Sequence, residues 1–346
     1  MRSHTRVAAV AAALLLLCGV PMAMAAPAEP RTAGHLAFIV RAAHGMRLEV
    51  SDAAGHVARV IPAFQPYSPA LSPDGTRVAY SDVAYPGDRY RTLVISTVDG
   101  RTRRALQLGI GSMDFPTWSP DGTQLAFVHF SYSQTGYLAA NAWAYAGQAT
   151  LEVVDLRTMR TRNLAVLGPF AGAPAGVGAA YTDGNLPGTP SWSPRGDRIA
   201  FIGSTGAYGN AAGWYTGELR EAIYTIHPDG SGLSLVSALT LGWGLDFSPD
   251  GSQLAVGYVD RNNGAWQSDL VVLGADGSAP HVVATLAAGG SLGMPTWSPR
   301  GDRIAVEADS ANGQVTLMDA DAHSGRLTRV LPSADRRDLE SPDWSR

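Results

Sequence analysis

The sequence predicts an all-β protein, a six-bladed β-propeller in which each blade is a four-stranded antiparallel sheet. The first observation is a Ser-Pro-Asp/Arg-Gly motif that recurs along the chain. Its marker serine stands at positions 72, 119, 193, 248 and 298, and at 345 in a copy cut off by the end of the chain. The second is the spacing of 47, 74, 55, 50 and 47 residues between these serines, because repeats of about 40 to 50 residues are typical of propeller blades. The third is that the two ends of the chain carry complementary parts of one blade.

The composition excludes several other classes of protein. The 346 residues include 39 Gly and 22 Pro, whereas only 16% are charged, so turns rather than charged helix faces dominate. This balance, with a formal net charge of −4, argues against a coiled coil, a disordered tail and a nucleic-acid-binding protein. All 26 basic residues are arginine, so the chain has no lysine to serve as a Schiff-base amine, a P-loop cation or a general base.

Residues 1–25 are predicted to be a secretory signal peptide. Arg2 and Arg6 precede an apolar run over 7–20, and the small-x-small sequence at 23–25 is a cleavage signal. The apolar run is too short for a membrane anchor, so no transmembrane span is expected. The predicted location is therefore the periplasm or the extracellular space.

Lipid attachment is not expected at the single cysteine. Cys18 follows Leu17, where a lipoprotein processing site requires a small residue, and cleavage after residue 25 would remove both. The mature chain would then contain no cysteine for disulfide or thiol chemistry. A short linker is expected at 26–34, followed by one propeller domain at 35–346.

After the linker come three strands of an incomplete blade, expected at 35–38, 47–51 and 57–60. They lack a first strand, and the C-terminal segment 343–345 is a first strand that lacks the other three. Joining these pieces closes a ring of six blades, which removes the open sheet edge that would otherwise template aggregation.

Each complete motif is expected to form a tight turn between the first and second strands of a blade. Proline presets φ in such a turn, aspartate bonds neighbouring backbone groups, and glycine supplies the permissive conformation. Second strands are expected at 77–80, 124–127, 198–201, 253–256 and 303–306. Third strands are expected to begin at Leu93, Leu151, Ile223, Leu270 and Val315, with short fourth strands such as 162–166 and 326–330.

An aromatic residue directly precedes the marker serine in five copies of the motif. Because these residues belong to the repeat itself, we expect them to pack between neighbouring blades. They are Trp118, Trp192, Phe247, Trp297 and Trp344.

Units of the form Pro-x-Trp-Ser-Pro-Asp-Gly-x-x-Leu/Ile-Ala-Phe, as at 116–127, resemble the repeats of the TolB-like six-bladed β-propeller family, which is related in architecture to WD40-like repeat propellers. The resemblance covers essentially the whole predicted mature chain. The namesake of the family carries a small α/β domain before its propeller, whereas 26–34 leaves no room for one. The resemblance therefore implies a stand-alone propeller, and it implies the namesake's role in outer-membrane integrity only weakly.

The two faces of the ring are expected to differ. If each inner strand runs towards its Ser-Pro-Asp-Gly turn, all the long loops lie on the opposite face, at 81–91, 129–149, 168–189, 203–221 and 257–268. Long loops on a rigid scaffold commonly carry binding residues. A simpler interpretation is that the aromatic rings of these loops pack against one another and bind no partner. We predict a partner-binding site on this loop face, formed by Tyr132, Tyr137, Trp143, Tyr145, Tyr208, Trp214, Tyr215 and Trp266.

Two functional classes remain open, because the fold alone does not choose between them. The favoured one is a non-catalytic, monomeric scaffold that binds a protein, peptide or envelope glycan and needs no cofactor or metal. The alternative is a propeller enzyme, a polysaccharide lyase or lactonase-like hydrolase with its site at the channel mouth. An enzyme should show convergent acids, histidines or a metal there, whereas a binding module should show an aromatic patch.

Several local motifs resemble chemical sites but have simpler explanations. The segment 289–293 matches Gly-x-Ser-x-Gly, yet no helix is expected after it, which favours a glycine-rich turn. The segment 319–325 resembles the start of a calcium loop but lacks its closing glutamate, which favours a hairpin turn. The Arg-Gly-Asp tripeptides at 195–197 and 300–302 fall on the repeat turn.

The acids and histidines of the loop face do not have the spacing of metal ligands. His129 is predicted to be a satisfied polar residue rather than a general base. The loop acids could converge on a cation near the channel, but solvated side chains are the simpler interpretation, and we predict no catalytic residue. These acids are Asp82, Asp88, Asp183, Asp260 and Asp309.

Overall fold

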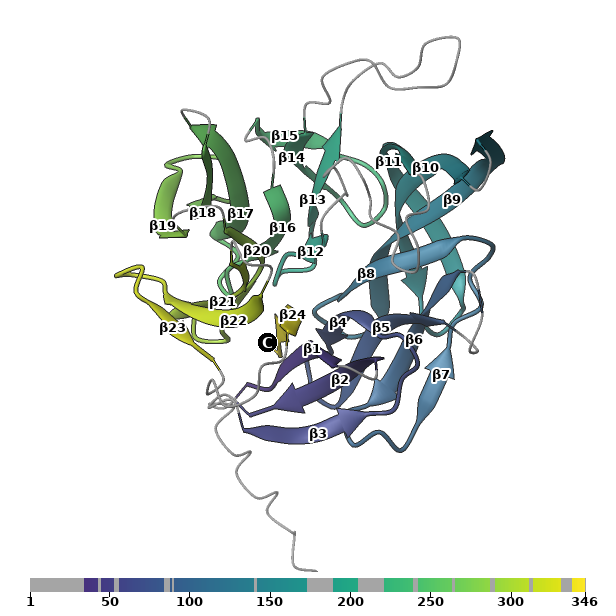
Figure 1. The fold of residues 1–346 in the computed structure, drawn as a ribbon, viewed down its shortest axis with the longest axis horizontal. Coiled ribbons are helices and arrows are strands. Elements are labelled where there is room, and N and C mark those ends of the chain that lie inside the picture. Colours follow the sequence, from purple (N-terminus) through teal and green to yellow (C-terminus); the bar gives the residue numbers. More distant parts are fainter. Residues whose placement is uncertain are drawn as a thin grey trace, which may run out of the picture. The chain divides into compact units, whose positions relative to one another are not determined.

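The computed structural model (Figure 1) describes residues 34–42, 45–52, 56–83, 88, 90–139, 142–172, 189–204, 221–238, 242–262, 265–286, 290–310, 314–330 and 338–345. The chain divides into Met1–Arg31 and Thr32–Arg346, and every described residue belongs to the second unit. The predicted signal peptide lies outside the described residues. Among those residues, no helix is long and apolar enough to cross a membrane.

The described residues form six antiparallel sheets of four strands, as the repeat predicts. Blade 1 contains β24 (Asp338–Trp344), β1 (Leu36–Ala42), β2 (Gly45–Ser51) and β3 (Val57–Ile61). Blade 2 contains β4 (Tyr67–Leu71), β5 (Arg77–Val83), β6 (Arg91–Thr97) and β7 (Arg103–Ala105). Blade 3 contains β8 (Ser112–Trp118), β9 (Gln124–Ala139), β10 (Ala142–Asp155) and β11 (Arg160–Gly172).

The other three blades repeat this order. Blade 4 contains β12 (Ser191–Trp192), β13 (Ile199–Ser204), β14 (Glu221–Ile226) and β15 (Ser234–Ser237). Blade 5 contains β16 (Gly242–Phe247), β17 (Gln253–Asn262), β18 (Ala265–Gly274) and β19 (His281–Leu286). Blade 6 contains β20 (Ser291–Trp297), β21 (Arg303–Asp309), β22 (Val315–Asp321) and β23 (Leu327–Arg329).

The ring closes through the two ends of the chain. In Figure 1, β24 lies beside β1, and the two strands pair from Leu36 with Trp344 to Arg41 with Asp338. Ser345 donates a backbone hydrogen bond of 2.9 Å to the His35 carbonyl. Each inner strand contacts the inner strand of the next blade, in the cyclic order β4, β8, β12, β16, β20 and β24. The predicted closure is confirmed.

The apolar core consists of six clusters, each shared by two neighbouring blades. Trp118, for example, packs with Ala70 and Leu93 of blade 2 and with Leu125 of its own blade. Its Nε1 donates a 2.9 Å hydrogen bond to the Ala70 carbonyl. All five predicted repeat aromatics lie in such clusters and are at most 6% exposed, which confirms their packing role: Trp118, Trp192, Phe247, Trp297 and Trp344.

The repeat turns owe their shape to an acid that binds the marker serine. The Ser72 hydroxyl donates a 2.5 Å hydrogen bond to Asp74, and these bonds hold the pKa of Asp74 below its usual value despite the opposing effect of burial. In two turns arginine replaces this aspartate, and the aspartate two residues later accepts the hydrogen bond of the marker serine instead. Ser193 donates to Asp197, and Ser298 donates to Asp302. The Arg-Gly-Asp tripeptides are therefore turn elements.

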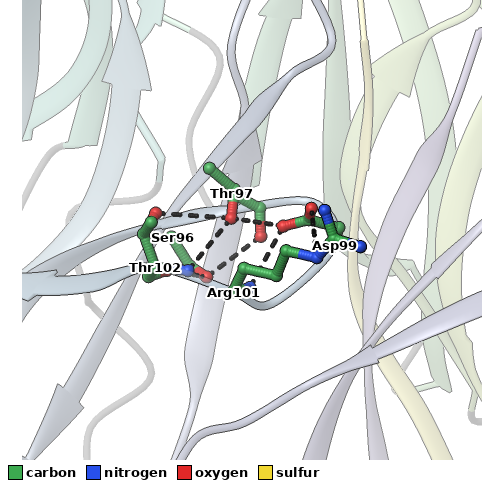
Figure 2. A network of polar contacts seen from close by, with 5 residues as sticks. All are labelled: Ser96, Thr97, Asp99, Arg101 and Thr102. Carbon is green, nitrogen blue, oxygen red and sulfur yellow. Dashed lines mark hydrogen bonds and ion pairs between the residues drawn. The ribbon is translucent and has the colours of Figure 1, made fainter.

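A related turn joins β6 to β7 in blade 2 (Figure 2). Asp99 accepts hydrogen bonds from the Thr97 hydroxyl at 2.6 Å and from the backbone N–H of Arg101 at 3.0 Å. Ser96 closes the turn by donating to the Thr102 carbonyl at 2.7 Å. The Asp-Gly pairs at the ends of third strands are thus explained by local turn chemistry.

The prediction of loops at 129–149 and 257–268 was wrong. β9 and β10 stay paired up to Ala139 with Ala142, and β17 and β18 up to Asn262 with Ala265. A two-stranded ribbon satisfies its backbone groups by pairing, so it does not need the apolar alternation that marks a half-buried strand. Parts of the other three predicted loops are also strands, at 81–83, 168–172 and 203–204.

Candidate functional site

Five of the six inner strands share a backbone irregularity four residues before the marker serine. Here Ser68, Phe115, Met294 and Ser341 have positive φ angles of 46°, 58°, 47° and 53°, and Gly244 has 80°. The register shifts at these points, which makes them β-bulges. A non-glycine residue in this conformation costs about 1 kcal/mol or more, and bulges re-aim neighbouring side chains. Backbone strain is often found at functional sites. Because the strained residue recurs in several blades, the beginning of the inner strands is a candidate functional region.

Four polar side chains lie at this end of the blades, and we call them the axial cluster: Tyr67, Asp114, Glu307 and Glu340. Tyr67, Asp114 and Glu340 stand five residues before the marker serine in blades 2, 3 and 1. The charges of all three acids raise the pKa of Tyr67, so each of them lies close enough to act on this phenol. Asp114 is 1% exposed and Glu340 7%, whereas Tyr67 and Glu307 are partly exposed.

Glu307 joins the cluster from a second strand. Blade 6 has Gly293 at the position that Tyr67 occupies in blade 2, and Glu307 pairs with this glycine. Its Oε2 accepts a 2.7 Å hydrogen bond from the backbone N–H of Ser341, which belongs to the bulge of blade 1. The carboxylate therefore bridges two blades at the start of their inner strands.

Burial raises the pKa of Glu307 to about 8. The charges of Glu340 and Asp309 also raise it, while the Ser341 N–H and Arg41 lower it. Arg41 is mainly engaged elsewhere, since its Nε lies 2.7 Å from Glu340. Glu307 is thus mostly protonated at pH 7, and a positive charge placed beside it would favour ionisation.

Burial also raises the pKa values of Tyr67 and Asp114. Arg91 opposes both shifts, because it lies 5.1 Å from the Tyr67 ring centre and 3.8 Å from Asp114 Oδ2. The Tyr67 ring meets Phe115 edge-on at 5.7 Å. Arg91 and Phe115 both contact the Tyr67 ring, so they restrict the position of its hydroxyl group.

Three buried polar atoms beside the cluster form no hydrogen bond of good geometry with the described residues, Asp114 Oδ1, Ser68 Oγ and Ser81 Oγ. The Ser81 hydroxyl is the hydrogen-bond donor nearest to Asp114, and it lowers the pKa of that carboxyl against the effect of burial. Buried polar atoms are rarely left unpaired in proteins, because each costs about 1–3 kcal/mol.

The predicted aromatic residues divide into three groups. Tyr132 and Tyr137 lie in β9, Trp143 and Tyr145 in β10 of the same blade. Trp266 lies in β18 of blade 5, where it pairs with Arg261, so the register does not bring it to the others. The three remaining predicted residues lie outside the described part of the chain: Tyr208, Trp214 and Tyr215.

Four of these aromatics belong to the paired strands β9 and β10. Trp143 pairs with Tyr137, and Tyr132 pairs with Gly147 after a bulge. Tyr145 stands between Trp143 and Gly147 in β10 and pairs with Thr135. Tyr132, Tyr137, Trp143 and Tyr145 thus form what we call the aromatic ribbon.

His129 lies in β9 rather than at the start of a loop. Its Nδ1 lies 2.8 Å from Glu152 Oε1, and its Nε2 lies 2.9 Å from the Ile110 carbonyl. Both partners accept hydrogen bonds, so only the doubly protonated ring satisfies both. The hydrogen bond with Glu152 raises the pKa of His129 most, and Ile110 adds to it against burial. The predicted satisfied polar role is confirmed, and His129 fastens the link between blades 2 and 3.

We expect the stabilisation from the two hydrogen bonds of His129 to depend on pH. Because the folded pKa is raised above 6.5, the stabilisation is fully present below about pH 6.5 and fades as the pH rises through the folded pKa. Chemical denaturation should show wild type about 1 kcal/mol more stable than His129→Gln at pH 6, with a smaller gap at pH 9. His281→Gln, at an exposed histidine, is the matched control. A gap that stays constant or grows with pH would contradict this account.

The sequence motifs that resemble catalytic or metal sites have structural roles wherever they fall among the described residues. Ser291 begins β20, with no helix after it, and its hydroxyl donates to Asp309 at 3.0 Å. Asp321 binds Ser324 in the hairpin turn between β22 and β23. Asp82 is not solvated, since it is fully buried and accepts four hydrogen bonds. Among the described residues, no three His, Cys, Asp or Glu side chains could hold a metal ion together.

Comparisons with known proteins show the fold. No protein-family model and no curated protein matches the sequence. TolB from Acinetobacter baumannii superposes with a TM-score of 0.64 at 17% identity, over 90% of this chain and 66% of that one. A candidate TolB from Agrobacterium tumefaciens gives 0.55 at 16% identity, over 86% and 88%. Hydrazine synthase of Kuenenia stuttgartiensis gives 0.59 at 14%, over 92% and 47%. The chain is a TolB-like six-bladed β-propeller in fold.

Proposed function

We propose that this TolB-like propeller is an exported scaffold that holds a protein, peptide or envelope glycan on the face where second and third strands join. It does so without chemistry of its own. The observation that supports the proposal is the aromatic ribbon, because Tyr132, Tyr137, Trp143 and Tyr145 all belong to the paired strands β9 and β10. The predicted signal peptide and the TolB-like fold support an envelope or secreted location.

The ribbon suits a binding role for physical reasons. Tyrosine and tryptophan combine a large apolar surface with a polar tip, and they dominate the binding energy of many interfaces. Paired strands hold them at fixed spacing, so little conformational entropy is lost when a partner binds. The axial cluster stands at the beginning of β8 in the same blade, so one partner can engage both features.

Capture from an envelope extract tests this proposal. We expect the double variant Trp143→Ala with Tyr145→Ala to retain at most about a tenth of the partner held by the wild type, as for a binding hot spot. Phe64→Ala is the matched control, because Phe64 is an aromatic residue 48% exposed outside the ribbon. Equal capture by wild type and the ribbon variant would contradict the proposal.

One observation favours the alternative of a propeller enzyme. Glu307 is mostly protonated at neutral pH and lies at the beginning of the inner strands beside Tyr67, so it could act as a general acid. A polysaccharide lyase or lactonase-like hydrolase would use the axial cluster in this way. Turnover of a polyuronate or a lactone by the wild type, lost in Glu307→Gln, would favour the enzyme over the scaffold.

A further inference from the structure

We propose that His129 is a pH-sensitive latch, whose protonated ring holds the segment between blades 2 and 3 at the root of the aromatic ribbon and releases it when the ring loses a proton. We call this segment, residues 107–111, the strap. The inference deepens the proposed function and rests on it where it makes partner binding depend on pH. Three features carry it: the position of the ring, its two acceptors, and the weak attachment of the strap.

The latch stands where β9 leaves its inner neighbour. The pairing of β8 with β9 ends at Ser112 and Phe130, and beyond this point the described strands pair β9 with β10 alone. His129 directly precedes Phe130, and Tyr132, the first residue of the aromatic ribbon, follows two residues after it. The strap ends directly before Ser112, so a movement of the strap takes place at the root of the ribbon.

The hydrogen bond to the strap needs the second proton of the ring. His129 Nδ1 lies 2.8 Å from Glu152 Oε1, and Nε2 lies 2.9 Å from the Ile110 carbonyl oxygen. A neutral imidazole has a single N–H group. Because a carboxylate is the stronger acceptor, the neutral ring keeps its bond to Glu152 and turns a lone pair towards the Ile110 carbonyl. Two acceptors then face each other, and the strap loses its attachment.

Glu152 of β10 is the charged group that faces the ring. Its hydrogen bond is the largest of the effects that raise the pKa of His129, and its charge adds to them. On the side of β8, Met113 stands opposite His129, and the next residue, Asp114, interacts with Ser81 and is affected by Arg91. The strap contains no titratable residue. Release of the strap should therefore follow the titration of His129.

The strap has few other attachments. Leu108 packs against the core shared by blades 2 and 3 and anchors one end, whereas Ile110 is 83% exposed, so burial of its side chain adds little. Gly109 and Gly111 flank Ile110 with φ angles of 131° and 126°, a conformation that favours glycine. A Cβ atom at Gly111 would lie 2.8 Å from His129 Nε2, so glycine lets the strap approach the ring this closely.

Methyl NMR on the full-length protein, labelled at isoleucine, tests the latch. The Ile110 signal, assigned with Ile110→Val, should shift and sharpen between pH 6 and pH 9 with the same midpoint as the ring signals of His129. Because a hydrogen bond from a charged donor is lost, the released population should rise about tenfold or more. Ile304 is fully buried in blade 6, and its signal should stay constant as the internal control. An Ile110 signal that does not respond to pH would overturn the proposal.

Three variants assign the response to this ring. His129→Phe keeps a ring without N–H groups, so the Ile110 signal should stand at its released position already at pH 6 and should not titrate. Glu152→Gln removes the charge that favours protonation, so the midpoint should move to lower pH. His281→Phe, at an exposed histidine, should behave like the wild type. An Ile110 signal that still titrates in His129→Phe, or an unchanged midpoint in Glu152→Gln, would contradict the latch.

Partner binding tests the consequence for the aromatic ribbon. In the latched state Ile110 is held at the root of the ribbon, where it offers the partner a further apolar contact. The wild type should therefore capture about threefold more partner from an envelope extract at pH 6 than at pH 9, and His129→Phe should capture the same lower amount at both. If capture depends on the ribbon variant but not on His129, the proposed function stands and its regulation by the latch is wrong. If the Ile110 signal titrates but no partner is captured, the latch stands and the proposed function fails.

Discussion

Deletion of residues 338–346 should prevent the chain from folding into a soluble monomer. These residues include β24, which is the inner strand of blade 1 and contacts the inner strands of both neighbouring blades. Trp344 is 2% exposed in the cluster shared by blades 6 and 1. Asp343 accepts a 2.7 Å hydrogen bond from the backbone of Leu71 in blade 2. Without β24, the edge of β1 is open and the ring is not closed.

Expression yield, size-exclusion chromatography and circular dichroism measure the effect of this deletion. The truncated protein should be recovered as aggregate or as an expanded monomer without a cooperative thermal transition. Removal of Arg346 alone is the control, because Ser345 and its bond to His35 then remain, and this protein should melt like the full chain. A truncated protein that melts cooperatively near the wild-type temperature would show that ring closure is dispensable.

The sequence was sufficient to predict the blades because their turns rest on local chemistry. A serine, a proline, an acid and a glycine within five residues produce the same turn in each repeat, and Asp197 and Asp302 show that the acid can move without loss of the turn. The inter-blade aromatics were predictable for the same reason, since Trp118 and its equivalents stand beside the marker serine. Closure followed from matching the incomplete repeats at the two ends.

The length of the strands was less predictable. The segment 129–149 is rich in alanine, glycine, serine and glutamine, which suggests a loop, yet it pairs as a ribbon. Backbone pairing between the two strands satisfies their polar groups without a period of two in hydrophobicity, so no such period marks the segment. The predicted aromatic residues in this segment were placed on a loop, whereas the structure assigns Tyr137 and Trp143 to paired strands.

The axial cluster was only partly accessible from the sequence. Alignment of the repeats on their marker serines would have shown polar residues at Tyr67, Asp114 and Glu340, all at one position. Glu307 stands out less, because the equivalent second-strand position holds Ser81, Val128, Ile202 and Gly257 in other blades. Its role depends on the bulge at Ser341 and on the raised pKa that comes from burial, and both require the three-dimensional arrangement.

Replacement of Asp82 by alanine should destabilise the protein by about 3–5 kcal/mol, although this residue lies outside the axial cluster. Asp82 is fully buried in β5 and accepts hydrogen bonds from the backbone N–H groups of Phe64 at 3.0 Å, Gln65 at 2.7 Å and Val83 at 2.9 Å. Arg103 adds a charged donor at 3.0 Å. Removal of the carboxylate leaves these donors unpaired, and urea denaturation of wild type and variant measures the loss.

Two further variants separate the carboxylate's charge from its hydrogen bonds. In Asp82→Asn, the amide oxygen can still accept from Gln65 and Val83, but the amide N–H group would face the donors of Phe64 and Arg103, so we expect an intermediate loss. Asp99→Ala removes an exposed acid from the neighbouring turn and should cost much less. If Asp82→Ala were no worse than Asp99→Ala, the link between blades 1 and 2 would not depend on this carboxylate. A large loss in Asp82→Ala alone would show that a carboxylate predicted to be solvated instead fastens consecutive blades together.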